Sequence, residues 1–322
     1  MSPEARRRHE RLVVAGLALA CLLAIALFLS VGARGSWSFV LAFRGTKVLA
    51  MVLVGTAIAV STVLFQTVTA NRILTPSIMG FDALYALIQT LLVFGLGAAA
   101  TSALDPRLVF GAEVAVMVGL STLLYRWLFA GGLGSLYLLV LVGIVFGTLF
   151  RSVSGLLQRL IDPNEFVVLQ DRMFASFNTV DGSLLAGSSA AILAISAFIA
   201  RRIGRLDVLG LGRDAAVNLG LDHRREVTIA LVLVSLLVSI STALVGPVTF
   251  FGLLVANLAY LTIRSHRHAV VLPAAALIAI LALVGGQFVL ERVFRFDIAL
   301  SIVIEFVGGL AFLVLLVRGL NR

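Results

Sequence analysis

The chain has one lysine, Lys47, and one cysteine, Cys21, among its 322 residues. A Walker A loop needs a lysine after a glycine-rich turn to reach nucleotide phosphates. Lys47 follows Arg44-Gly45-Thr46 and has no such turn before it. A single cysteine also excludes disulfides within the chain and metal sites built from several thiolates. We therefore expect this chain to bind no nucleotide, cofactor or metal of its own.

Charged residues are scarce as well, at 13% of the chain, whereas hydrophobic residues make up 61% and the mean hydropathy is +1.11. Because soluble domains carry about 25% charged residues, this composition predicts a membrane protein with several spans. The net charge of +9 does not indicate nucleic-acid binding, because the arginines form short clusters between apolar stretches. No paired nucleophile and base stands out, so an enzyme is not expected.

Ten apolar stretches are long enough to cross a bilayer core, which takes about 20 residues per helix. The sequence thus predicts an all-α membrane protein with a single domain over 1–322. Between the spans, 71–82 contains Pro76 and Gly80 and predicts a loop or broken helix that dips toward the membrane. The longest outer loop is predicted at 158–182, with a short helix around 165–177. The ten spans are predicted near 12–32, 46–68, 83–100, 108–128, 135–157, 183–200, 226–245, 248–264, 269–289 and 298–318.

Ten spans place both termini on one side of the membrane. If that side is the cytoplasm, sixteen of the 25 lysines and arginines lie inside and nine lie outside. The positive-inside rule then favours a cytoplasmic N-terminus and C-terminus. Residues 1–11 form a basic cytoplasmic tail, and the apolar run that follows is long enough to be a retained helix rather than a signal peptide.

The segment 201–225 is the longest inside loop and carries six arginines. Within it, 211–220 is predicted to form a short helix, with Asp214 in its first turn and Gly220 as a left-handed cap. Ala215, Ala216 and Leu219 would form a small apolar face, and Asp222 would cap the next membrane helix. Two alternatives remain open: a helix that docks into a groove of a partner protein, or a solvated basic loop.

Two acids, Glu113 and Glu305, lie well inside predicted spans, where charge is costly and often functional. They predict either a proton relay in a secondary transporter, a polar contact lining a pathway, or a carboxyl hydrogen-bonded between helices. In the fifth span, Gly143, Gly147 and Ser152 are small residues that allow close helix packing or line a pathway.

Two stretches of the chain resemble each other. Ser61-Thr62-Val63-Leu64 and Ser241-Thr242-Ala243-Leu244 are each followed by an Ala-Asn pair. Transporters are often built from repeats, although helices rich in leucine, alanine and valine also match by chance. Both explanations stay open.

Several motifs resemble the permeases of the iron-siderophore and vitamin B12 ABC importers, the FecCD-like family. The segment 211–220 is similar to their coupling segment, with its Leu-Gly…Ala-x-x-Leu-Gly pattern. The segment 71–80 resembles their Asn-Pro-Leu-x-x-Pro-x-x-x-Gly motif, and 246–253 resembles Gly-Pro-Ile-x-Phe-x-Gly-Leu. The stretch 161–177 is similar to the subgroup that handles catecholate-type siderophores. One departure is Val255-Ala256-Asn257, where most members have Val-Pro-His.

The resemblance implies a type II ABC importer permease fold in the bacterial cytoplasmic membrane. It implies a ferric siderophore of the catecholate type as cargo, which moves by alternating access between two permeases, the second of which differs from this chain. No short motif in the sequence identifies the siderophore. Two partner ATPases would bind ATP and Mg²⁺, and an extracytoplasmic binding protein would deliver the siderophore. The competing hypothesis from the residues is a proton-coupled secondary transporter that uses Glu113 or Glu305.

The resemblance also assigns residues to roles. The ATPase-coupling residues would be Leu211, Gly212, Arg213, Asp214, Ala215, Ala216, Leu219 and Gly220. Arg44 and Lys47, at the mouth of the second helix, and Arg292 would dock the binding protein. The translocation pathway or its gate would include Gly143, Gly147, Ser152, Glu305, Gly131 and Gly132.

Overall fold

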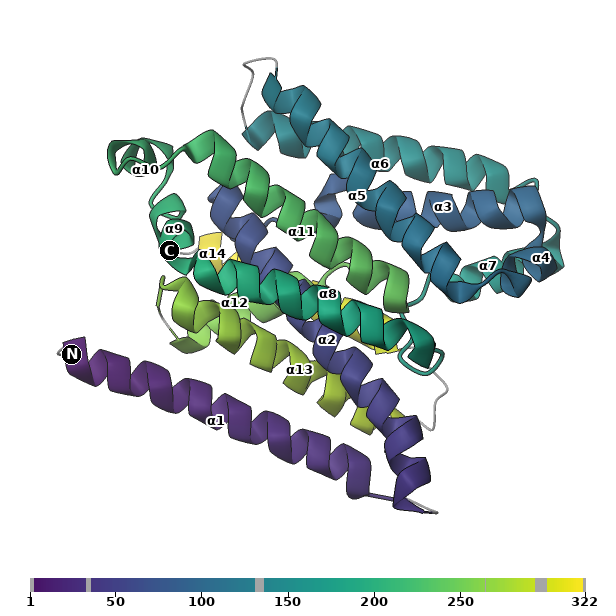
Figure 1. The fold of residues 1–322 in the computed structure, drawn as a ribbon, viewed down its shortest axis with the longest axis horizontal. Coiled ribbons are helices and arrows are strands. Elements are labelled where there is room, and N and C mark those ends of the chain that lie inside the picture. Colours follow the sequence, from purple (N-terminus) through teal and green to yellow (C-terminus); the bar gives the residue numbers. More distant parts are fainter. Residues whose placement is uncertain (1–2, 33–35, 131–135, 264, 293–299, 321–322) are drawn as a thin grey trace.

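The computed structural model describes residues 3–32, 36–130, 136–263, 265–292 and 300–320, and it is drawn in Figure 1. These residues form helices joined by short connections, with no strand among them. The helices are α1 (Pro3–Ser30), α2 (Trp37–Thr69), the 3-10 helix η1 (Pro76–Met79), α3 (Phe81–Leu96), α4 (Ala98–Ala103), α5 (Pro106–Ala130), α6 (Leu136–Gln158), α7 (Pro163–Arg172), α8 (Gly182–Arg201), α9 (Ile203–Leu209), α10 (Arg213–Asn218), α11 (His223–Val245), α12 (Phe251–Ile263), α13 (His268–Arg292) and α14 (Leu300–Leu320).

The all-α prediction is confirmed, and each of the ten predicted ranges overlaps a helix of the described residues. Within the described residues, seven helices are long and apolar enough to span a membrane, and α3, α12 and part of α14 are shorter apolar helices. A helix satisfies its own backbone hydrogen bonds, which is why long apolar runs fold this way where no water is available.

Helix α2 forms the centre of the bundle and packs against α11 and α13. Its side chains Ala57, Val63 and Phe65 are fully buried. Helix α1 lies at the edge of the bundle against α13 and exposes several leucines, as a helix facing lipid would. The buried core thus lies between helices that are far apart in the sequence.

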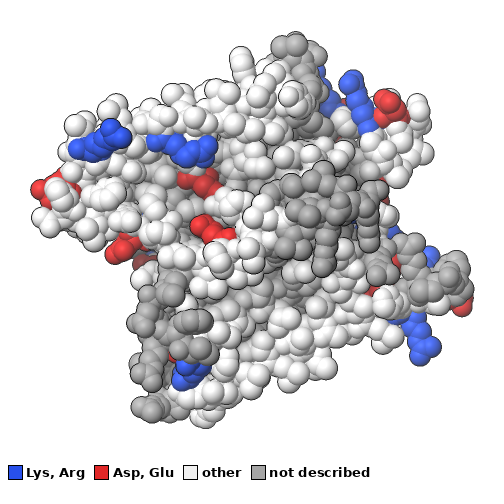
Figure 2. All heavy atoms as spheres, turned by 180° about the vertical axis from the view of Figure 1, so that it is seen from behind, with Lys and Arg blue, Asp and Glu red and all other residues white. Residues whose placement is uncertain are grey.

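The two ends of the bundle carry different short elements. Figure 1 shows the N-terminus, the C-terminus, α9 and α10 at one end, which we call the α10 end. Helices α4 and α7 lie at the opposite end, the α7 end. Figure 2 shows the charged side chains of one face gathered toward these two ends, with largely uncharged described surface between them. This distribution suits a protein whose middle lies in lipid.

Three predicted boundaries were wrong, each for a local reason. Helix α2 begins at Trp37 rather than near 46, so Arg44 and Lys47 lie inside it and not at its mouth. The span predicted at 83–100 is broken at Gly97, whose φ of 83° ends α3 and allows α4 to begin. Helix α12 begins at Phe251 because Gly246, with a φ of 96°, ends α11 and Pro247 follows it.

The connections at the α7 end are capped by aspartates. The side chain of Asp162 accepts a hydrogen bond of 2.8 Å from the Asn164 amide at the start of α7, which ends at Arg172 rather than at 177. Asp181 accepts a bond of the same length from the Ser183 amide at the start of α8. This amide lowers the pKa of Asp181, because it stabilises the carboxylate. Caps of this kind fix where the helices begin.

Candidate functional site

Helix α10 is a folded element at the surface of the α10 end. It begins after Gly212, whose φ is 93°, and ends at Gly220, whose φ is 81°. The Leu221 amide donates to the Ala216 carbonyl and the Gly220 amide donates to the Val217 carbonyl, each at 2.9 Å. These two bonds form a Schellman cap, which confirms the predicted left-handed role of Gly220.

The neighbouring turns agree with the sequence as well. Asp214 lies in the first turn of α10, and the Asp222 side chain accepts a bond of 3.1 Å from the Arg225 amide at the start of α11. Together with the Schellman cap, these contacts show that the segment contains an ordered helix. The docking role of α10 itself stays a prediction.

The exposed face of α10 differs from the predicted one. Ala216 is fully buried and therefore points into the protein, so the apolar face predicted from Ala215, Ala216 and Leu219 was wrong. A six-residue helix has room for only one inward face, and Ala216 occupies it. The residues that expose large apolar side chains are Leu211, Val217 and Leu219, at 63%, 53% and 64%. Val217 was not predicted as part of the exposed face. Its place next to the buried Ala216 on a short helix is the signal that its side chain points outward.

Arginines of the same segment are tied to the membrane helices. Glu226, in the first turn of α11, accepts bonds of 2.6 Å from Arg202 and 2.9 Å from Arg205. The Glu226 side chain is 8% exposed, so two cations surround one nearly buried carboxylate. A charge removed from water needs such partners. The base of the segment is therefore held rigidly against α11.

A second anchor joins α9 to the bundle. Asp207 accepts bonds from both the backbone amide and the Nδ1 of His268, at 2.8 and 2.7 Å. The Nε2 of the same ring lies 2.7 Å from the Thr67 hydroxyl at the end of α2. These contacts link α9, α13 and α2 through hydrogen-bonded side chains.

The dipping segment 71–80 packs backbone to backbone against α6. A β-carbon built at Gly80 would lie 2.8 Å from the Gly147 Cα, and one at Gly143 would lie 2.8 Å from the Met79 Cα. No side chain fits at such distances, so glycine is required there. The predicted broken helix is thus confirmed, with Pro76 buried at the start of η1.

This contact shows one of the two predicted uses of the small residues in α6. Gly143 and Gly147 are buried against η1 and Gly80, which is close helix packing. Ser152, farther along α6, is exposed. A pathway role for these three residues stays a prediction. The predicted gate glycines, Gly131 and Gly132, lie outside the described residues.

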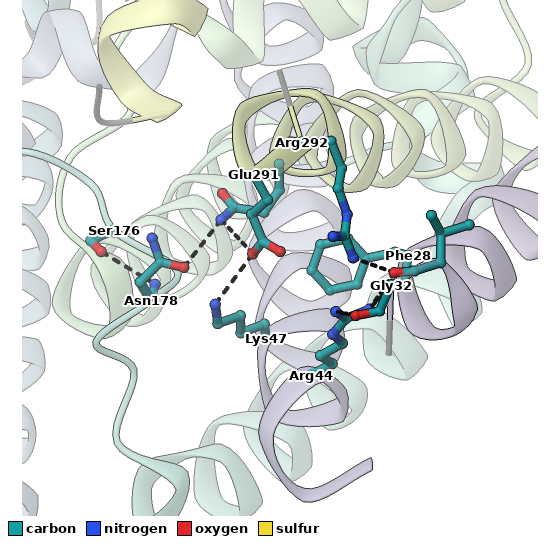
Figure 3. A network of polar contacts seen from close by, with 10 residues as sticks. Phe28, Gly32, Arg44, Lys47, Ser176, Asn178, Glu291 and Arg292 are labelled. Carbon is teal, nitrogen blue, oxygen red and sulfur yellow. Dashed lines mark hydrogen bonds and ion pairs between the residues drawn. The ribbon is translucent and has the colours of Figure 1, made fainter. Parts of the chain in front are cut away.

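The predicted docking cations at the other end of α2 have partners within the chain. Figure 3 shows Lys47 pointing toward Glu291 of α13, and their Nζ and Oε1 atoms lie 3.2 Å apart. Both side chains are nearly buried, at 7% and 11% exposure. A binding protein would have to break this pair to reach the ammonium group. The docking role of Lys47 stays a prediction, and its visible role is to join α2 to α13.

Arg44 and Arg292 hold the end of α1. Arg44 donates to the carbonyls of Phe28, Val31 and Gly32 at 2.9 to 3.0 Å, and Arg292 donates to the Val31 carbonyl as well (Figure 3). The last carbonyls of a helix lack partners within it, so these guanidinium groups act as a cap. Their predicted contact with a binding protein remains a prediction.

The network at this end continues through two amides. Gln287 donates from Nε2 to Glu291 at 3.1 Å and to the Asn178 side chain at 3.1 Å. The backbone amide of Asn178 donates to the Ser176 hydroxyl. The connection between α7 and α8 is thus linked to α13 and α2 through four side chains (Figure 3).

Removing one partner of the Lys47–Glu291 pair is expected to destabilise the folded chain more than removing both. Lys47→Met leaves a nearly buried carboxylate without its cation, and Glu291→Gln leaves the ammonium, each costing about 3 kcal/mol. The double variant removes both charges and should recover part of that loss. Thermal unfolding of the four proteins in one detergent measures this coupling. Additive losses in the double variant would contradict a direct interaction.

Membrane acids occupy distinct surroundings. Glu113 is buried and accepts a bond of 2.5 Å from Gln89, whose own carbonyl accepts from Arg172 at 3.2 Å. This contact supports the third reading of Glu113, a carboxyl hydrogen-bonded between helices. Glu305 lies beside Thr249 and Asp82. Asp82 was missed as an intramembrane acid because it lies two residues after Gly80, in a stretch too polar to be predicted as a span.

Comparison with known proteins gives three findings. The FecCD transport family model matches residues 12–318. The petrobactin import system permease protein YclO of Bacillus subtilis is 46% identical over 313 residues, covering 97% of this chain and 98% of the relative. The petrobactin import system permease protein FatC of Bacillus anthracis is 39% identical over 275 residues, covering 85% of this chain and 78% of the relative.

A solved structure shares the fold. It is described as an inward-facing conformation of a metal-chelate type ABC transporter. Its TM-score is 0.84 at 22% sequence identity, with 96% of this chain and 99% of that chain covered. At this level of identity the match concerns the fold, and it agrees with the permease fold expected from the sequence.

Proposed function

This chain belongs to the FecCD transport family and is a permease subunit of a siderophore ABC importer, and from that premise we propose that its cargo is ferric petrobactin. The observation that carries the proposal is the identity of 46%, spread over 97% of the chain, to a petrobactin import permease. The catecholate-type subgroup predicted from 161–177 is the class to which petrobactin belongs.

The proposed mechanism is alternating access driven by ATP in partner subunits. Helix α10, with exposed Val217 and the flanking exposed Leu211 and Leu219, would insert into a groove of an ATPase subunit. The contacts of Glu226 and Asp207 support this role, because a rigid base transmits movement of α10 to α11, α13 and α2. The transporter would contain two such ATPases, which bind ATP and Mg²⁺.

The remaining partners follow from the family. We propose a second permease of different sequence, with which this chain forms the pathway, and an extracytoplasmic binding protein that delivers the siderophore. Both termini and α10 would face the cytoplasm, in a bacterial inner membrane. The excess of arginine in the segments at the α10 end supports this orientation.

The competing hypothesis of a proton-coupled secondary transporter is not supported by the comparisons, whose family and relatives are import permeases. The surroundings of Glu113 agree, because a carboxylate held at 2.5 Å by Gln89 has a structural partner. No titrating carboxyl is needed when another subunit supplies the energy.

Uptake of ⁵⁵Fe-labelled petrobactin into proteoliposomes tests the function. The vesicles would contain this chain with its partner permease, ATPase and binding protein. Uptake is expected only with ATP supplied on the ATPase side, and it should persist when a protonophore collapses the proton gradient. An unrelated hydroxamate siderophore serves as the control for cargo. Equal uptake of both siderophores would contradict the proposed cargo while leaving the transporter class intact.

Neutralising the membrane acids is expected to leave this uptake largely in place. Glu113→Gln and Glu305→Gln keep the size of each side chain and most of its hydrogen bonding, but they cannot titrate. Each variant should retain at least about a third of the wild-type rate, because an energy source in another subunit makes proton binding dispensable. Uptake that follows the proton gradient without ATP, and disappears in Glu305→Gln, would overturn the ABC assignment.

A further inference from the structure

A small polar pocket lies among the central helices, where apolar side chains would be expected. Hydroxyl groups line it from α2, from the dipping segment and from α11, and the carboxylate of Asp82 lines it from α3. The hydroxyl residues include Ser61, Thr62, Ser77, Ser241 and Thr242. Polar groups inside a membrane protein are costly unless they serve a packing or binding role.

The two similar stretches of the sequence meet at this pocket. Ser61-Thr62 comes from α2 and Ser241-Thr242 comes from α11, and all four residues are buried. Helix α2 is followed by the dipping segment with Pro76, and α11 is followed by Gly246 and Pro247. Each Ser-Thr pair therefore precedes an interruption of regular helix, and the pocket lies between the two interruptions.

Two of these hydroxyl groups donate their protons within their own helices. Ser61 donates its proton to the Ile58 carbonyl at 3.0 Å, and Ser241 donates to the Val238 carbonyl at 2.9 Å. A hydroxyl whose proton is used within its own helix keeps oxygen lone pairs available. Oxygen atoms of this kind, together with a carboxylate, are the ligands that hard cations prefer.

One carboxylate oxygen in the pocket lacks a partner. The Oδ2 atom of Asp82 is buried and has no hydrogen bond to any described residue. The groups that act on this carboxylate are the hydroxyls of Ser77 and Thr249 and the charge of Arg151, and Glu305 lies near it. A buried carboxylate oxygen without a partner is costly, so this atom points to a ligand that the pocket would hold.

The size of the pocket limits what that ligand is. The cavity volume is about 20 Å³, which is room for about one particle of the size of a water molecule. A hydrated divalent ion or an organic cation would not fit in this space. We propose that the pocket binds one dehydrated alkali cation, held by Asp82 and by the hydroxyl oxygens of the two Ser-Thr pairs.

The cation would hold together the two interrupted regions of the fold. Its ligands come from α2, α3 and α11, which surround the dipping segment. Binding to the folded state alone would stabilise it in proportion to the logarithm of ion concentration. This proposal does not rest on the cargo or on ATP, because the site is built entirely from this chain.

Thermal unfolding of the full chain with its partner subunits in nanodiscs tests the site. NaCl, KCl and N-methyl-D-glucamine chloride would be compared at one pH and one ionic strength. At least one alkali salt is expected to raise the midpoint by about 3 °C over the organic cation, with a saturating dependence on concentration. Asp82→Asn should remove this difference, whereas Asp171→Asn, which neutralises an exposed acid on α7, should keep it.

A second variant covers the case in which Asp82→Asn does not fold. Ser241→Ala with Thr242→Val removes two oxygen ligands and should raise the half-saturating salt concentration about tenfold, which corresponds to 1.4 kcal/mol of lost binding. Equal midpoints in all three salts would overturn the proposal. The proposal would also be overturned if the unfolding midpoint depended on pH in the same way in all three salts, because that result indicates a protonated Asp82 instead of a bound cation.

Discussion

Replacing both Val217 and Leu219 with glutamate is expected to abolish ATP-dependent uptake while the membrane helices still fold. Both side chains are more than half exposed on α10, so the new charges meet water in the isolated chain and cost it little. In a complex, the same charges would be buried against an apolar groove of the ATPase without partners. We expect at least a hundredfold loss of ATPase affinity, because two buried unpaired charges each oppose docking.

Co-purification of the ATPase with this chain measures the loss directly, and siderophore uptake measures its consequence. The matched control is Val217→Ile with Leu219→Met, which keeps the face apolar and should keep both readouts. Normal ATPase binding by the glutamate variant would contradict the docking role of α10.

Ala216→Glu provides a contrast on the same helix. Its side chain is fully buried, so a glutamate there should reduce the amount of folded chain instead of acting on docking alone. Detergent-solubilised monodisperse protein measures that amount. Full recovery of folded Ala216→Glu together with lost ATPase binding would restore the face that the sequence predicted.

Gly143→Ala is expected to destabilise the chain by about 1–3 kcal/mol and to impair uptake. The added β-carbon would lie 2.8 Å from the Met79 Cα, a backbone atom that moves only if η1 moves. Helix η1 lies directly before α3 in the chain and contributes to the lining of the polar pocket. A shift of η1 would therefore disturb the centre of the bundle.

Gly155→Ala is the matched control, because it makes the same change on the same helix. A β-carbon at Gly155 has no neighbour within 4 Å. It should leave stability unchanged or raise it slightly, since alanine favours a helix more than glycine does. The thermal unfolding midpoints of the two variants show whether the added β-carbon destabilises the chain only at Gly143. Equal midpoints would show that the close approach of α6 to η1 is not required.

Local features of this protein followed from its sequence. The apolar runs predicted the ten helices, because a span needs a fixed length and satisfies its own backbone. Gly220 and Asp222 predicted the ends of two helices, because caps depend on residues a few positions apart. Pro76 and Gly80 predicted the broken segment for the same reason.

The partners of charged side chains did not follow from the sequence. Lys47 pairs with Glu291, which lies 244 positions away, and no local pattern connects them. The sequence therefore offered Lys47 as a free cation, and only the packing of α2 against α13 showed its partner. The meeting of Ser61 with Ser241 and Asp82 in one pocket depends on the same packing.

The faces of short helices were also decided by tertiary structure. Periodicity identifies an inward face over several turns, but α10 has only six residues, and its position against α9 and α11 turned Ala216 inward. The sequence by itself determined that this protein has apolar helices long enough to span a membrane and where capping residues end some of them, because those properties depend on neighbouring residues. Which side chains meet, and which remain exposed for partners, depended on contacts between helices far apart in the chain.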